Sequence, residues 1–304
     1  MVLSGALVAL MASGLAGQEP SGDGTFRFGE VLREGDGPRD LVLMPCLGCD
    51  AHSWTEFMAR NRTRFRMVAL TWPGMGATAL PEVVPDSLGT PYFDYLVNAL
   101  RLIVERESLR RPVIVGHSAA AVLAVRFAAE HPELVSGVVN VDAVVANGDT
   151  YGFDRARRRA WADAEMRGVL ARYDNDSSWA KLNAAPGDMP AHRAAFYERM
   201  WRTPPRAHVF AYWRDWLRTD VGVLLPILRV PFFAIHALPA DSDRAAAIRT
   251  DIRDRYRRAP MPVGGRVVFV EGSSHTVWEY RPDAFDAALA AFALGSVVET
   301  AREP

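Results

Sequence analysis

The chain has 304 residues, a formal net charge of −1 at pH 7, 49% hydrophobic residues and no internal repeat. This length suffices for one large α/β domain with an inserted smaller unit. The near-zero net charge gives no electrostatic reason to expect nucleic acid or an anionic membrane as a partner.

The first stretch, Met1–Gly17, is apolar and uncharged. It resembles the hydrophobic part of a signal peptide, with small residues near Gly14–Gly17 for cleavage, although no basic residues precede it. It is too short for a stable membrane span. We therefore expect a secreted or periplasmic protein, the alternatives being a cytoplasmic location or a translation start at Met11.

The elements expected next alternate between apolar runs and an amphipathic pattern, which predicts strands and helices in turn. In chain order they are strand Phe26–Leu32, buried strand Asp40–Met44, helix Ser53–Asn61, strand Arg66–Thr71 and helix Tyr92–Glu107. The alternation is typical of an α/β protein.

The only two cysteines, Cys46 and Cys49, follow the second predicted strand as a C-x-x-C pair. A zinc site would need two further ligands, and only His52 is close. A redox pair would need a thioredoxin-like context, which is absent. We predict that both lie in a loop over the active site and bind no metal, and that export would permit a local disulfide.

The strongest motif is Gly116-His117-Ser118-Ala119-Ala120. It follows the β-branched run Pro112–Val115 and precedes an alanine-rich helix at Ala119–Ala129. A strand that turns directly into a helix with Ser at the corner is the context of a G-x-S-x-G nucleophile elbow. The tight turn requires small residues two positions before and two positions after Ser118, and Gly116 and Ala120 meet this requirement. The helix N-terminus offers N–H groups to an oxyanion.

With this motif the sequence resembles the α/β-hydrolase superfamily over most of its length. The resemblance implies an α/β fold with a mostly parallel central sheet flanked by helices. Residues 25–146 and 220–300 would form the core. Residues 147–219, which lack a convincing strand and are rich in arginine and aromatic residues, would form an inserted helical cap.

The acid of the expected triad has two candidates. The predicted strand Leu134–Val145 carries Asp142 near the end of its apolar part, and one branch of the superfamily places its acid there. The other branch places it after the next strand, here Val230–Ala237, where Asp241 and Asp243 follow. Because these two residues begin a helical run in which Asp commonly caps the N-terminus, we favour Asp142 over Asp241.

The base is expected at His275, in the loop after the last predicted strand, Gly265–Val270, and before the closing helix Arg281–Leu294. This placement matches the catalytic His of the superfamily, and the order Ser118, Asp142, His275 matches its nucleophile–acid–base order. His236, on a predicted strand, is interpreted as a packed core histidine.

The resemblance also assigns the oxyanion hole. The superfamily usually has His-Gly after the second strand, whereas this chain has Pro45-Cys46. Alignment gives the backbone N–H groups of Leu47 and Ala119 as donors.

The resemblance implies a serine hydrolase that cleaves apolar, small-to-medium carboxylic esters through an acyl-enzyme, without a metal or an organic cofactor. Relatives that act as epoxide hydrolases or haloalkane dehalogenases have Asp at the elbow, which disfavours those activities. A C–C bond hydrolase, lactonase, thioesterase or cofactor-free haloperoxidase would use the same triad. A non-catalytic ligand-binding homologue is the remaining alternative, favoured only by the altered Pro45-Cys46 loop. The sequence predicts no oligomeric state.

Overall fold

The computed structural model describes residues 26–83, 89–143, 152–173, 175–185, 189 and 191–295. The apolar segment Met1–Gly17, predicted as a signal peptide, lies outside these residues. Within them, no helix combines the length and the apolar character that a membrane crossing requires.

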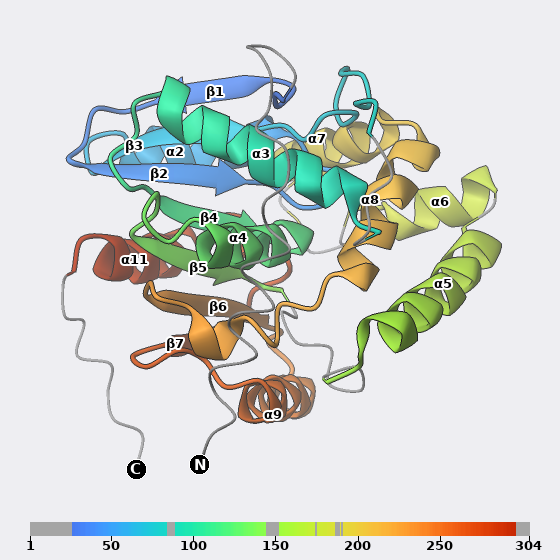
Figure 1. Cartoon of the computed structure of the whole chain (residues 1–304). Helices are drawn as coiled ribbons and strands as arrows, with labels where there is room; N and C mark the ends of the chain where they lie inside the picture. Colours follow the sequence, from blue (N-terminus) through green and yellow to red (C-terminus); the bar gives the residue numbers. More distant parts are fainter. Residues whose placement is uncertain are drawn as a thin grey trace, which may run out of the picture.

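The described strands form one seven-stranded sheet with the order β1-β3-β2-β4-β5-β6-β7 (Figure 1). All neighbouring strands are parallel except β1, which pairs antiparallel with β3. The strands are β1 (Val31–Glu34), β2 (Arg39–Met44), β3 (Phe65–Leu70), β4 (Val113–His117), β5 (Gly137–Val141), β6 (Phe232–Leu238) and β7 (Arg266–Glu271).

Both faces of the sheet are buried, which explains the continuous apolar runs of its strands. In β2, Val42 and Met44 face one hydrophobic core, whereas Leu41 and Leu43 face the other. The first face is covered by α3 (Pro91–Arg106), α4 (Ala119–Glu130) and α9 (Ser242–Arg258). The second is covered by the 3-10 helix η1 (Ala51–Trp54), α2 (Thr55–Asn61), α10 (Val277–Tyr280) and α11 (Pro282–Ala293). The predicted fold class, a mostly parallel sheet flanked by helices, is confirmed.

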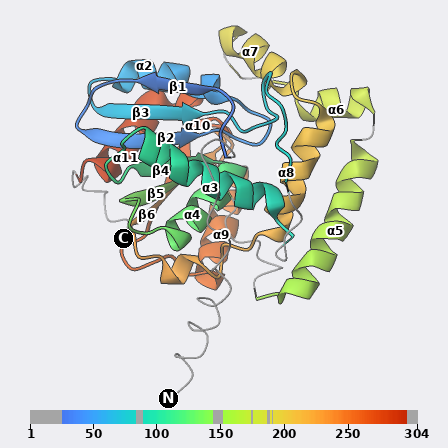
Figure 2. The same ribbon diagram turned by 45° about the horizontal axis from the view of Figure 1, so that its top comes forward.

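Between β5 and β6 the chain forms a group of helices, which we call the inserted helices. They are α5 (Arg155–Arg172), α6 (Asp176–Leu182), α7 (Ala191–Arg202) and α8 (Arg206–Arg218), followed by the 3-10 helix η2 (Leu225–Ile227). Figures 1 and 2 show them beyond the carboxyl ends of the central strands. From α8, Tyr212 Oη donates a 2.9 Å hydrogen bond to the carbonyl of Pro73, which follows β3.

Two predicted strand boundaries were wrong. The first strand begins at Val31 rather than Phe26, although Gly29 and Glu30 still exchange backbone hydrogen bonds with Thr71 beyond the end of β3. The fifth begins at Gly137 rather than Leu134, because the N–H of Leu134 turns back to bond the carbonyl of His131. In both cases an apolar residue beside a strand packs on the core without joining the ladder.

The turn at the end of β4 explains the need for Gly116. A Cβ atom at this position would lie 2.5 Å from the carbonyl oxygen of Ala120 and 2.6 Å from the Cα of Ala121. These atoms belong to the backbone of α4, so they cannot move aside cheaply. The first turn of α4 therefore packs directly against the last residues of β4.

We expect Gly116→Ala to lower the free energy of unfolding by about 1–3 kcal/mol, the usual cost of overpacking a core. The matched control is Gly168→Ala on the exposed side of α5, where a Cβ would have no neighbour within 4 Å. That change should raise the free energy of unfolding by about 0.5–1 kcal/mol, since alanine is the better helix former. Urea unfolding measures both, and equal stabilities of the two variants would contradict the close approach at Gly116.

Candidate active site

Ser118 lies at the corner between β4 and α4, with φ 57° and ψ −129°. A positive φ is rare for residues other than glycine, and such strain concentrates at functional sites. The turn is held by the N–H of Ser118, which donates a 3.0 Å hydrogen bond to the carbonyl of Val141 at the end of β5. The hydroxyl does not cap α4, so it remains available for chemistry at the helix N-terminus.

Asp142 occupies the corresponding place one strand further on, directly after β5, and its φ is also positive, at 48°. Its N–H donates a 2.8 Å hydrogen bond to the carbonyl of Ile235 in β6. Its Oδ1 accepts a 2.9 Å hydrogen bond from the N–H of Ala237, and its Oδ2 lies 2.7 Å from Nδ1 of His275. The structure therefore brings Asp142 and His275 together across 133 residues of sequence.

The surroundings keep Asp142 ionised. Burial by itself raises the pKa of this carboxyl group, but hydrogen bonding and charge from His236 and His275 outweigh it and hold the pKa well below its usual range. With Nδ1 of His275 donating to the carboxylate, Nε2 of the neutral ring carries the lone pair. That tautomer is the one a general base requires.

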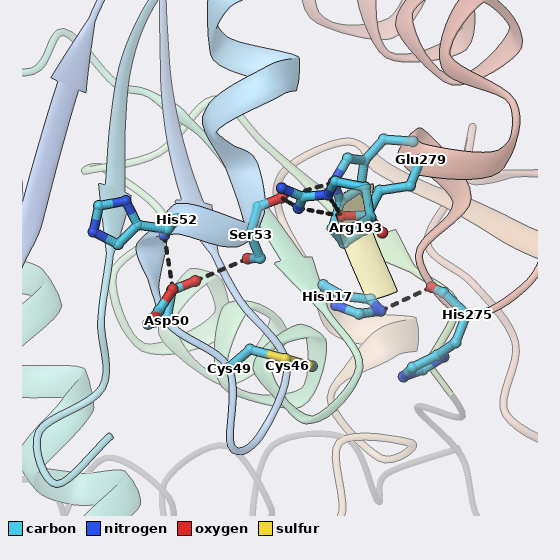
Figure 3. The surroundings of a disulfide bond; sticks show 10 residues. Cys46, Cys49, Asp50, His52, Ser53, His117, Arg193, His275 and Glu279 are labelled. Carbon is cyan, nitrogen blue, oxygen red and sulfur yellow. Dashed lines mark hydrogen bonds and ion pairs between the residues drawn. A yellow bond between two sulfur atoms is a disulfide. The ribbon is translucent and has the colours of Figure 1, made fainter. Parts of the chain in front are cut away.

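His117, the residue before Ser118, anchors the loop of His275. Its buried Nε2 donates a 2.9 Å hydrogen bond to the carbonyl of His275, and the two ring centroids are 4.4 Å apart (Figure 3). Burial, followed by the charge of His275, keeps the pKa of His117 well below its usual range, so the ring is neutral. In the sequence, His117 is only a variable position of the elbow motif, which gives no signal of this contact.

Among the described hydrogen bonds, none joins the hydroxyl of Ser118 to His275. In free enzymes this bond is often long and tightens only when substrate binds. The contact between His117 and His275 nevertheless places the serine beside the loop that carries the histidine.

The competing acid, Asp241, is used elsewhere. Its Oδ1 accepts a 2.7 Å hydrogen bond from the N–H of Arg244, which makes it the N-cap of α9. Asp243 lies in the first turn of the same helix. Capping accounts for the position of Asp241, and the positive end of the helix dipole favours Asp243 in the first turn.

The loop after β2 is closed by a disulfide between Cys46 and Cys49, whose Cα atoms are 5.1 Å apart (Figure 3). The disulfide packs against Met200, Phe196 and Tyr197 of α7. Leu47 lies inside the disulfide loop, and its N–H donates no hydrogen bond to another described residue. The N–H of Ala119 likewise donates to no other described residue.

A buried ion pair ties α7 to this region. Arg193 donates to Glu279 of α10, and the side chains are only 9% and 4% exposed (Figure 3). Arg193 also donates a 3.5 Å hydrogen bond to the carbonyl of Ser53, which accepts a 2.9 Å hydrogen bond from the indole of Trp278 as well. The described residues contain no cluster of three or more His, Cys, Asp and Glu side chains able to hold a metal ion.

The sequence matches the family model described as the alpha/beta hydrolase family over residues 41–288. A search of curated proteins returned no significant match. Similar solved structures include a hydrolase from Pseudomonas aeruginosa PA01 (19% identity, 88% of this chain and 94% of that chain, TM-score 0.65). An epoxide hydrolase from Bacillus megaterium (17%, 86% and 95%, TM-score 0.62) and an esterase from Exiguobacterium antarcticum (15%, 87% and 94%, TM-score 0.65) are also similar. At these identities the structures share the fold with this chain.

The two candidate acids can be separated by matched substitutions. Asp142→Asn should lower kcat for an ester by about 10⁴-fold, because the amide disfavours the tautomer of His275 that accepts a proton. Asp241→Asn should leave kcat unchanged, and also stability, because Asn caps a helix as well as Asp does. Steady-state kinetics and thermal unfolding of both variants provide the measurement, and a loss of activity at Asp241 instead would move the acid to the start of α9.

Proposed function

Because the chain belongs to the alpha/beta hydrolase family, we propose that it is a serine hydrolase that cleaves carboxylic esters through an acyl-enzyme. Ser118 is the nucleophile, His275 the general base and Asp142 the acid that orients it. The observation that carries the proposal is the 2.7 Å hydrogen bond between His275 and Asp142. The ring of His275 also contacts that of His117, the residue before Ser118.

In the acylation step, the hydroxyl of Ser118 attacks the ester carbonyl while Nε2 of His275 takes its proton. The ionised Asp142 stabilises the imidazolium that forms and keeps the ring in place. His275 then donates the proton to the leaving alcohol. In the second half, water attacks the acyl-enzyme with His275 again as the base, which releases the acid and restores Ser118.

The tetrahedral intermediate of each half carries a negative oxygen. In this proposal that oxygen is bound by the N–H groups of Leu47 and Ala119, which donate to no other residue in the part of the chain that the structure describes. The N-terminus of α4 adds favourable partial charge at the same place. Both donors belong to the backbone, so the unusual Pro45-Cys46 sequence supplies the same chemistry if the loop keeps its path.

The inserted helices act in this proposal as a cap that shapes the acyl pocket. Many of their aromatic rings pack within the protein, as when Tyr212 contacts Trp72 and Trp179 contacts Phe210. An apolar substrate is supported by the apolar side chains of α7 that contact the disulfide, because the disulfide closes the loop that contains Leu47. We therefore propose small-to-medium apolar esters as substrates.

Hydrolysis of p-nitrophenyl esters from acetate to laurate tests this function. Wild-type protein should turn over at least one of them, and Ser118→Ala should abolish turnover while the thermal unfolding midpoint stays near that of wild type, because the change removes only the nucleophile. A fluorophosphonate should label wild type and not the variant. Turnover that survives in Ser118→Ala would overturn the assignment of the nucleophile, and wild type that neither turns over nor is labelled would refute a serine hydrolase.

The disulfide gives a second test, of the oxyanion hole. Replacement of Cys46 and Cys49 by Ala together should lower kcat about tenfold and change KM less than about twofold, since a looser Leu47 loop stabilises the transition state less than the bound substrate. Wild type treated with a thiol reductant, with reduction verified by mass spectrometry, should change in the same direction. An unchanged kcat in the double variant would show that the donor is placed without the covalent link.

A further inference from the structure

Three buried side chains from different elements form a connected network beneath Asp142. Asn140 lies on β5, His236 on β6 and Tyr256 on α9, and each is less than a tenth exposed. The amide Nδ2 of Asn140 lies 3.0 Å from Oη of Tyr256, which lies 3.2 Å from Nε2 of His236. On its other side, Nδ1 of His236 lies 3.8 Å from Oδ1 of Asp142.

The amide of Asn140 fixes the direction of this network. Its Nδ2 donates to Tyr256 and to the carbonyl of Ala143, while its Oδ1 accepts the N–H of Ala143. Because Tyr256 Oη already accepts a hydrogen bond from Asn140, its own hydrogen must point to another acceptor, and among the described residues Nε2 of His236 is the acceptor within reach. Burial raises the pKa of Tyr256, so the phenol keeps that hydrogen.

A His236 ring that accepts at Nε2 must carry its proton on Nδ1 when it is neutral. This N–H faces Oδ1 of Asp142, the oxygen that does not bind His275. Apart from this contact, the described residues give Oδ1 one hydrogen bond, from the N–H of Ala237. The N–H groups of Ala237 and His236 then both present positive dipoles to Oδ1. The carboxylate of Asp142 therefore has less freedom to rotate Oδ2 away from His275.

We propose that His236 is a positioning residue for the catalytic acid, set in its Nδ1–H tautomer by Tyr256 and Asn140 and directed at Oδ1 of Asp142. The inference rests on the proposed function in so far as Asp142 is the acid of a serine hydrolase. A purely structural His236 would pack in the core, as the sequence suggested, and its tautomer would not matter to turnover.

The tautomer is measurable without any activity. In protein labelled with ¹⁵N-histidine, a long-range ¹H–¹⁵N spectrum at about pH 8, above the ordinary pKa of histidine, distinguishes the two neutral tautomers. We expect His236 to show the Nδ1–H form, with its signals assigned by their loss in His236→Asn. An Nε2–H tautomer, or a ring protonated on both nitrogens, overturns the proposal.

Substitutions at His236 test the effect on turnover. An asparagine amide can occupy the place of Nδ1, whereas a glutamine amide reaches the place of Nε2. In His236→Leu and His236→Gln we expect kcat to fall about tenfold while KM stays within about twofold of wild type, because the contact that orients Asp142 is lost. In His236→Asn we expect kcat to stay within about threefold of wild type. Wild-type kcat in His236→Leu, or equal losses in the Asn and Leu variants, overturns the proposal.

Tyr256→Phe keeps the ring and removes only the hydroxyl, so it covers the case in which a His236 variant fails to fold. In Tyr256→Phe we expect His236 to lose its preference for the Nδ1–H tautomer and kcat to fall several-fold. The thermal unfolding midpoint should stay close enough to that of wild type that unfolding explains neither change. An unchanged tautomer and an unchanged kcat count against the proposal.

The two proposals can fail separately. Wild type that is inactive on every ester refutes the proposed function, and the spectrum then tests only the tautomer of His236. Active wild type with a normal His236→Leu refutes only this inference.

Discussion

The parallel register of β4, β5 and β6 is the constraint on which the site depends. His117 pairs with Val141, and Val141 pairs with Ile235, so β4 and β5 end at the same level while β6 continues beyond it to Leu238. Ser118 and Asp142 each follow the last residue of a strand, which places both at the carboxyl edge of the sheet, where ligands bind in open α/β proteins. A shift of one residue between β4 and β5 would turn Asp142 to the opposite face.

The same register holds two strained residues in place. Ser118 and Asp142 both have positive φ, which costs about 1–3 kcal/mol for each. Each is held by its own N–H, which donates to the backbone of the next strand, Val141 for Ser118 and Ile235 for Asp142. The strain therefore persists because a hydrogen bond to the neighbouring strand holds each turn.

This dependence on neighbours also explains how much the sequence could predict. The strand–turn–helix at Ser118 could be predicted because the elbow is local, and the sheet because its strands are buried runs with strong patterns. The contacts of His117 and His236 were missed, because each joins residues far apart in the chain, 158 residues for His117 and His275. Asn140 gave no signal either, since its partner Tyr256 lies 116 residues away on α9. The hydrophobic pattern of a strand shows that such a side chain points inward, but it does not show which polar atom the side chain binds.

The ion pair of Arg193 and Glu279 sets a limit on how the inserted helices can move. It joins α7 to the short helix that follows His275, and the carbonyl of Ser53 joins both to the segment after the disulfide loop. Separation of two buried charges leaves each without a partner, which is strongly unfavourable. If α7 lifted to admit substrate, it would have to break this pair and uncover the apolar contacts of the disulfide. The position of α7 is therefore coupled to that of α10 and to the segment after the disulfide loop.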